Sequence, residues 1–215
     1  MIISRGRGYI FVHIPKTGGT SLATALEARA MKDDILIGDT PKAERRAARQ
    51  AKLFGKGRLG KHATLADLEG LLPAAEISQS FVFTLVRNPW DRIVSYYHWL
   101  RVQTFRHPAV ALAGRAGFSE FLNDSSTRSS LSAWPYGRYV STANGTERCD
   151  AFVRLENLAL DLAPVEQHVG FSLAPVQHLN RSDRPSDYRA AYTDSDANLV
   201  GELCRSDIER FGFRF

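Results

Sequence analysis

Two short apolar runs, each followed at once by a helical pattern, dominate the order of hydrophobic and polar positions. The first run, Gly8 to Ile14 (GYIFVHI), is rich in aromatic and β-branched residues, as expected of a strand buried on both faces. Leu22, Leu26 and Ala30 then recur every fourth residue, which predicts a helix over about Ser21 to Met31. The pattern therefore predicts a strand, a loop and a helix in succession.

The second apolar run, Ser80 to Val86 (SFVFTLV), repeats this plan. Asn88 follows it as a candidate N-cap and Pro89 as a first helical residue, so we expect a helix from there through Leu100. A third short strand is expected at Phe152 to Leu155. Alternating buried strands and helices predict an α/β fold with a P-loop-like parallel sheet flanked by helices, in which ligands bind beyond the carboxyl ends of the strands.

Capping signals predict two further helices. Thr40 and Pro41 have the residue types of an N-cap and a first helical position, and ERRAARQAK continues with good helix formers. Residues 193 to 196 resemble a capping box that opens a last helix. Residues 107 to 147 show little periodicity, and we expect mobile surface loops there, apart from a short helix capped by Ser119.

Composition narrows the class of protein. A chain of 215 residues and 23.9 kDa without a repeat or an evident linker suits a single domain over residues 1 to 215. Cys149 and Cys204 provide neither a disulfide framework nor the spacing of a metal site. No apolar segment is long enough for a membrane span or a signal peptide, so we expect a cytoplasmic protein.

The charge balance favours anionic partners. The formal net charge is +5 and the isoelectric point is near 9.4, which fits a nucleotide, a nucleic acid or an acidic glycan. The chain lacks a recognisable zinc, RRM or helix-turn-helix pattern, so nucleic-acid binding is disfavoured. The positive charges of the predicted helix after Thr40 form either a solvated helix face or a rim that attracts an acidic substrate.

The loop after the first strand has the composition of an anion-binding turn. Gly18 and Gly19 allow close approach of a ligand to the backbone, and the start of the following helix favours a phosphate. Lys16 adds a charge, and three hydroxyl residues add donors: Thr17, Thr20 and Ser21. A tight turn alone would need neither the lysine nor the hydroxyls.

This loop differs from the loop of nucleoside triphosphatases, in which the lysine follows the glycines. Here Lys16 precedes Gly18 and Gly19, and we find no acidic residue at a strand end suited to hold a magnesium ion. A metal-dependent kinase or ATPase is therefore disfavoured, and we expect no metal.

A second candidate phosphate site follows the second predicted strand. Arg87 ends that strand, and Ser95 lies seven residues after Asn88, two helical turns along on the same side. An arginine and a hydroxyl together can clamp a phosphate. Alone, this motif is weak, because strand-end arginines are often ordinary surface cations.

Together the two motifs resemble the sulfotransferase superfamily. FVHIPKTGGTSL contains, at residues 15 to 21, a loop that looks like the 5′-phosphosulfate loop of that family. FTLVRNPWDRIVSYYHW contains, at residues 86 to 97, a segment that looks like its 3′-phosphate motif. The HIPKTGGT and VRNPxxRxxSxY variants resemble the carbohydrate-type branch. KHATLADL, FVRLENL, HLNRS and the C-terminal DIERFGFRF follow in family-like order, so the resemblance covers most of the chain.

The resemblance implies a function and a set of residues. It implies transfer of the sulfuryl group of 3′-phosphoadenosine 5′-phosphosulfate (PAPS) to a hydroxyl or amine, with a carbohydrate or glycan as acceptor. The basic residues of the first variable loop, at about residues 32 to 60, favour an acidic glycan over a neutral lipid. The 5′-phosphosulfate is assigned to Lys16, Thr17, Gly18, Gly19, Thr20 and Ser21. The 3′-phosphate is assigned to Arg87 and Ser95, and the loop with Asn180, Arg181 and Ser182 is assigned to the 3′-phosphate or adenine.

Sulfuryl transfer needs a charge beside the leaving oxygen and a base for the acceptor. Lys16 is the natural cation at the bridging oxygen. His62 leads among the six histidines as the base, because KHAT resembles the family segment that carries it, whereas His13 is expected to pack as a buried, hydrogen-bonded residue. A carboxylate such as Glu156 is the competing candidate.

Two alternative functions would keep one or both phosphate motifs without sulfuryl transfer. A protein that binds PAPS or its product, adenosine 3′,5′-bisphosphate (PAP), without transferring the group would keep both phosphate motifs; a P-loop nucleotide kinase is a weaker alternative. Acceptor specificity is expected to come from variable loops at about residues 32 to 60 and 101 to 148, which carry no recognisable code for the acceptor.

Overall fold

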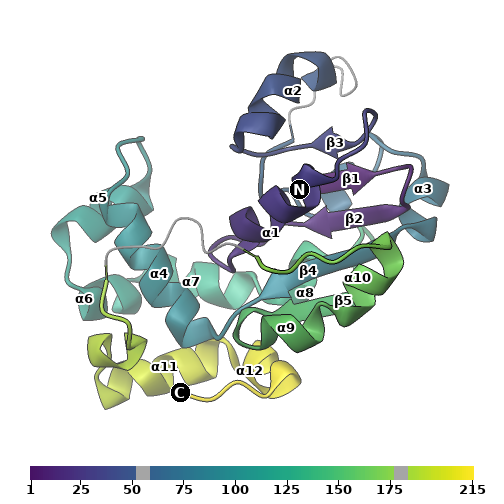
Figure 1. The fold of residues 1–215 in the computed structure, drawn as a ribbon. Coiled ribbons are helices and arrows are strands. Elements are labelled where there is room, and N and C mark those ends of the chain that lie inside the picture. The colour runs from purple at the N-terminus through teal and green to yellow at the C-terminus, as the bar shows by residue number, and fades with distance from the viewer. Residues whose placement is uncertain (52–58, 177–183) are drawn as a thin grey trace. The chain divides into compact units, whose positions relative to one another are not determined.

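The protein is described by a computed structural model covering residues 1–51, 59–176 and 184–215 (Figure 1). The chain divides into two compact units, each built from two segments. The first, Met1–Val86 with Tyr136–Leu179, contains the sheet and is called the sheet unit. The second, Arg87–Pro135 with Asn180–Phe215, is called the helical unit because its described elements are all helices.

The sheet has five strands in the order β3-β1-β2-β4-β5. Their bounds are Ile2–Ser4 (β1), Tyr9–Val12 (β2), Ile35–Leu36 (β3), Phe81–Val86 (β4) and Ala151–Arg154 (β5). The strands β2, β4 and β5 are parallel neighbours, and β1 runs antiparallel to both β2 and β3. The three predicted strands are confirmed, within a residue or two at their ends.

The sheet is mixed: its core of β2, β4 and β5 is parallel, as predicted, and β1 and β3 add an antiparallel edge that was not predicted. β1 and β3 have three and two residues, which is too short for a hydrophobic period to show in the sequence. β1 pairs with β2 across a tight turn in which Gly8 has φ +62°. Hairpin pairing of this kind needs no long crossover, whereas each parallel pair does.

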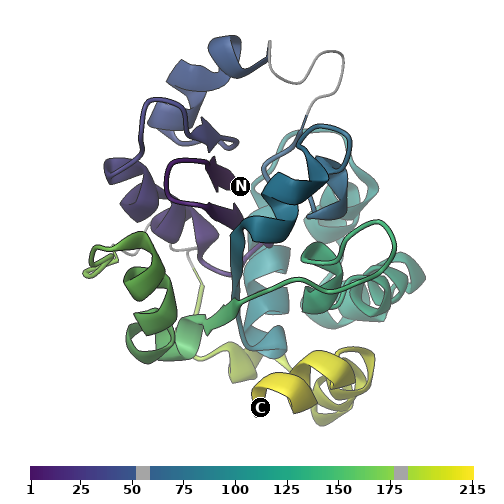
Figure 2. The same ribbon diagram turned by 90° about the vertical axis from the view of Figure 1, so that its right-hand side faces the viewer.

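Both faces of the sheet are covered. The described helical segments of this unit are α1 (Gly19–Ala28), α2 (Pro41–Ala51), η1 (Ala66–Leu68), α3 (Ala74–Gln79), α8 (Tyr136–Tyr139), η2 (Leu155–Asn157), α9 (Leu158–Asp161) and α10 (Ala163–Val169). Phe11 and Phe83 pack with Leu22 of α1 and Val165 of α10 in one core. Figure 2 shows α1 and α10 on one side of the strands and α3 on the other.

The helix predicted at Pro41 forms, and its arginines have a structural use. Thr40 caps α2, accepting a hydrogen bond at Oγ1 from Ala43 N at 3.1 Å. Arg46 and Arg49 donate to the main-chain oxygens of Asp34 and Lys32, at 2.8 and 2.7 Å. Two of the three arginines of α2 therefore tie the helix to the preceding loop, which leaves little of the rim proposed for an acidic substrate.

The helical unit contains α4 (Pro89–Arg101), α5 (Pro108–Arg115), α6 (Phe118–Asn123), α7 (Ser125–Ala133), η3 (Tyr188–Ala191), α11 (Asp194–Leu203) and α12 (Arg205–Phe211). Asn88 caps α4 by accepting from Trp90 N at 3.1 Å, and Thr193 caps α11 by accepting from Asp196 N at 3.1 Å. Both predicted caps are confirmed. The Trp90 indole N–H donates to Ala197 O at 2.9 Å and so joins α4 to α11.

The expectation of surface loops over residues 107 to 147 is wrong for most of that span. Residues 108 to 139 form four short helices, and Leu112 of α5 and Phe121 of α6 pack with Tyr97 of α4 in a common core. Helices of one or two turns have too few residues for a clear period. Ser119 does not cap α6, because Gly117 occupies that position and the Ser119 hydroxyl donates to Asp196 Oδ1 at 3.0 Å.

No helix in the described ranges has both the length and the apolar content needed to span a bilayer.

Candidate functional site

The loop between β2 and α1 is turned by two residues with left-handed backbone conformations. Lys16 has φ 65° and Gly18 has φ 85°. A non-glycine residue in this region costs about 1–3 kcal/mol unless the surroundings hold it there, and such residues cluster at functional sites. Thr17 is fully buried and its hydroxyl donates to Ile14 O at 2.9 Å, so its side chain holds the turn.

The N-terminus of α1 is open to an anion. The helix starts at Gly19, two residues earlier than predicted, and its N-cap is Gly18, which has no side chain to accept from the first-turn N–H groups. The first turn also lacks an acidic residue. The partial positive charge of a helix N-terminus favours a phosphate or sulfate group at such a position.

Neighbouring side chains leave no space for a Cβ at either glycine of the loop. A Cβ on Gly18 would lie 2.9 Å from Leu155 Cδ1, in addition to the penalty of its positive φ. A Cβ on Gly19 would lie 2.3 Å from His13 Cδ2. The sequence suggested that glycine was needed for a ligand to approach, and the structure shows that it is also needed for His13 and Leu155 to pack under the loop.

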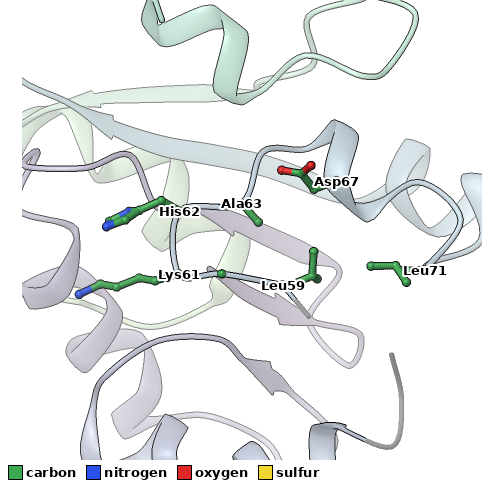
Figure 3. Close-up of a pocket in the computed structure, with 7 residues that line it drawn as sticks. Leu59, Lys61, His62, Ala63, Asp67 and Leu71 are labelled. Carbon is green, nitrogen blue, oxygen red and sulfur yellow. The ribbon is translucent and has the colours of Figure 1, made fainter. Parts of the chain in front are cut away.

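Lys61 and His62 reach this loop from the segment before η1. Lys61 Nζ donates to Thr20 Oγ1 at 3.1 Å and lies 2.6 Å from Asp39 Oδ1. Figure 3 shows the side chains of Lys61 and His62 extending in the same direction, away from Asp67. A cation therefore lies at the first turn of α1, next in sequence to the candidate base.

The hydrogen bond of His62 fixes its tautomer. Nδ1 lies 2.8 Å from the main-chain oxygen of His13. A carbonyl oxygen can only accept, so Nδ1 carries the proton and Nε2 of the neutral ring keeps a lone pair. The His62 side chain is thereby oriented as a proton acceptor through Nε2, which is the form that a general base requires.

Both histidines are neutral at pH 7. Burial lowers the pKa of His62 below its usual value, an effect that the hydrogen bond to His13 opposes and the Lys61 ammonium reinforces. Because His62 is an exposed residue, this effect is weaker than at His13. His13 is 4% exposed, and burial lowers its pKa well below the usual value.

An open groove of about 550 Å³ lies along this segment and includes His62 in its wall. Its lining residues are Leu59, Gly60, Lys61, His62, Ala63, Asp67 and Leu71. The leucines are drawn with Asp67 toward one end of the groove in Figure 3, and His62 and Lys61 toward the other. The volume falls within the range of small-ligand sites, roughly 300–1,000 Å³.

The second predicted motif lies in the helical unit. Arg87 donates through Nε and NH2 to Asp91 Oδ2, at 2.8 and 2.6 Å. Ser95 is 6% exposed in α4. Arg184 NH2 donates to the other oxygen of the Asp91 carboxylate, Oδ1, at 2.5 Å.

Several of these residues were missed by the sequence analysis. Lys61 directly precedes His62 in KHAT, and Asp91 lies four residues after Arg87 on a predicted helix, so both had a local signal. Asp39 and Arg184 had none, because their partners are distant in sequence.

Other candidates are less informative. Arg181 and Ser182, with Asn180, lie outside the described residues. Glu156 is exposed in η2, next to the Leu155 that packs beneath Gly18. Among the described residues, no group of three or more histidine, cysteine, aspartate or glutamate side chains is arranged to hold a metal ion.

Comparisons with known proteins agree with the resemblance. A search of curated protein sequences gave no match. The model of the sulfotransferase family matches residues 1–214, nearly the whole chain. The chain therefore belongs to the sulfotransferase family, enzymes that transfer a sulfuryl group and for which PAPS is the implied donor.

Proposed function

We propose that this enzyme transfers the sulfuryl group of PAPS to a hydroxyl or amine of a carbohydrate or glycan acceptor. The observation that carries the proposal is the hydrogen bond to His13 that orients the neutral ring of His62, the proposed base, beside the loop that leads into α1. Lys61 links the two through Thr20.

The residues present fit the phosphosulfate of the donor. The uncapped start of α1 offers main-chain N–H groups, and Lys16, Thr20 and Ser21 add a charge and two hydroxyls. The Thr17 hydroxyl is engaged with Ile14 O, so Thr17 serves by shaping the loop. Arg87 and Ser95 are the proposed residues for the 3′-phosphate.

The donor, when bound, supplies a sulfuryl group on a phosphate leaving group. His62 Nε2 takes the proton of the acceptor hydroxyl as the acceptor oxygen bonds to sulfur and the sulfur–oxygen bond to phosphate breaks. Lys16 stabilises the negative charge that develops on the departing phosphate oxygen, and Lys61 supplies a second ammonium at Thr20. Removing one such donor typically lowers the rate by about 10²- to 10³-fold.

The groove beside His62 is the proposed place for the acceptor. Its wall contains the proton-accepting residue, so a hydroxyl held there would meet the base. A cytoplasmic location is a further part of this proposal.

Transfer from ³⁵S-labelled PAPS to a panel of acidic glycans, neutral oligosaccharides, amino sugars and phenols tests this function. We expect labelled product from at least one carbohydrate and a loss of roughly 10²-fold or more in His62→Ala. We expect no change in Arg205→Met, an exposed arginine of α12 outside the donor loop and the acceptor-side segments. PAP binding without transfer to any acceptor would instead support a binding protein. Loss of activity in a Glu156→Gln variant but not in His62→Ala would reassign the base.

A further inference from the structure

One carboxylate in the helical unit lies between two guanidinium groups. Asp91 Oδ2 accepts both contacts from Arg87, and Asp91 Oδ1 accepts one from Arg184. The side chains of Arg87, Arg184 and Asp91 are only 14%, 11% and 19% exposed. Because one negative charge serves two positive ones, this cluster keeps a net positive charge in a largely buried position.

Arg184 has spare hydrogen-bonding capacity. Its NH1 group is buried and has no hydrogen-bond partner in the part of the chain that the structure describes. An unpaired buried donor costs about 1–3 kcal/mol, and more when it is charged. Such a group in a native protein calls for an explanation, and a ligand that accepts the hydrogen bond is one.

A dianionic phosphate monoester suits this arrangement. Phosphate has several acceptor oxygens and is commonly bound by the fixed fork of arginine, and Arg87 is already the candidate for the 3′-phosphate of the donor. A single structural ion pair would satisfy Asp91 with Arg87 alone. The second arginine, Arg184, adds a positive charge and a hydrogen-bond donor at NH1, and a doubly charged ligand needs both.

We propose that Arg184 is a second guanidinium for the phosphate that Arg87 binds, and that Asp91 is a positioning residue that holds both arginines. This proposal rests on the proposed function, because it takes the phosphate to be the 3′-phosphate of PAPS and PAP. Arg184 then helps the enzyme to distinguish a 3′-phosphorylated nucleotide from AMP.

Calorimetric titration of PAP and AMP into the wild type, Arg184→Met, Arg184→Lys and Arg189→Met tests the assignment. We expect Arg184→Met to weaken PAP binding by tenfold or more, as for loss of a charged hydrogen bond, with AMP affinity unchanged. Arg184→Lys keeps the charge without the fork and is expected to lie in between. The control, Arg189, also pairs with an aspartate but is 52% exposed, so its replacement is expected to have no effect.

The outcomes distinguish failure of the proposed function from failure of the role of Arg184. A wild type without preference for PAP over AMP would remove the proposed function and the role of Arg184 together. A preference that survives fully in Arg184→Met would remove only the role of Arg184, as would an equal loss for PAP and AMP. If Arg184→Met does not fold, the PAP-to-AMP ratio of Arg184→Lys decides, and a wild-type ratio overturns the proposal.

Discussion

Adding a single methyl group at Gly19 is expected to disturb both the fold and the donor loop. In Gly19→Ala, the new Cβ would lie 2.3 Å from His13 Cδ2 and 2.4 Å from His13 Nε2. The His13 ring has little room to move, because it stacks on Phe11 with ring centroids 5.8 Å apart and meets His62 edge-on at 4.9 Å. The loop and the base are therefore expected to shift together.

The size of the effect follows from two opposing contributions. Overpacking of this kind costs about 1–3 kcal/mol, whereas Gly to Ala in an open helix gains about 0.5–1 kcal/mol. We expect a net loss of about 1–2 kcal/mol in the free energy of unfolding. Gly114→Ala in α5 is the matched control, since its added Cβ would meet no atom within 4 Å apart from its chain neighbours and the backbone of its own helix, and it should be neutral or slightly stabilising.

Urea denaturation and PAP titration of both variants measure this effect. Gly19→Ala should also be less costly in a His13→Ala background, where the ring that it would strike is absent, and a double-mutant cycle isolates that coupling. If Gly19→Ala were as stable as Gly114→Ala and bound PAP normally, the packing of His13 beneath the loop would be wrong.

Three further predictions concern single groups. His62→Ala should leave PAP affinity unchanged. Because burial lowers the pKa of His62, the acid limb of the wild-type pH profile of kcat/KM should lie below 6.5, the ordinary pKa of histidine. An acid limb above 6.5 would contradict the role of His62 as the base. Lys61→Met should weaken binding of PAPS more than of PAP by titration, and equal effects would place Lys61 away from the sulfuryl group. Burial raises the pKa of Asp196, but hydrogen bonds from Thr193, Ser119 and Asn123 outweigh this and lower it below 3.8, so its stabilisation is present at neutral pH and lost on acidification. Asp196→Asn should therefore cost about 1–3 kcal/mol at pH 7, and the difference in urea midpoints should shrink as pH falls below that value; a pH-independent difference would refute this.

Local signals made part of the fold predictable. The strands β2, β4 and β5 are short, mostly apolar runs, and the caps at Asn88 and Thr193 are single residues whose side chains bind the next turn. Each of these features depends on neighbours within a few residues. β1 and β3 depend instead on pairing with a strand elsewhere in the chain, and nothing in three or two residues indicates that pairing.

The candidate site likewise contains residues with a local sequence signal and contacts that only the fold creates. Lys16, the glycines and His62 belong to contiguous motifs, so their residue types pointed to chemistry. The hydrogen bond from His62 to His13 and the contact of Lys61 with Thr20 join segments 49 and 41 residues apart. Arg184 and Asp91 are 93 residues apart. Such pairings are set by tertiary packing, and a single sequence does not reveal them.

The most direct test of the account is titration calorimetry, without added metal, of the wild type with PAP, AMP and ATP. The account predicts that PAP binds clearly more tightly than AMP or ATP, and that the preference disappears in Arg87→Ala. Equal binding of the three nucleotides, or binding of ATP only when magnesium is present, would contradict the assignment of the two phosphate motifs to PAPS.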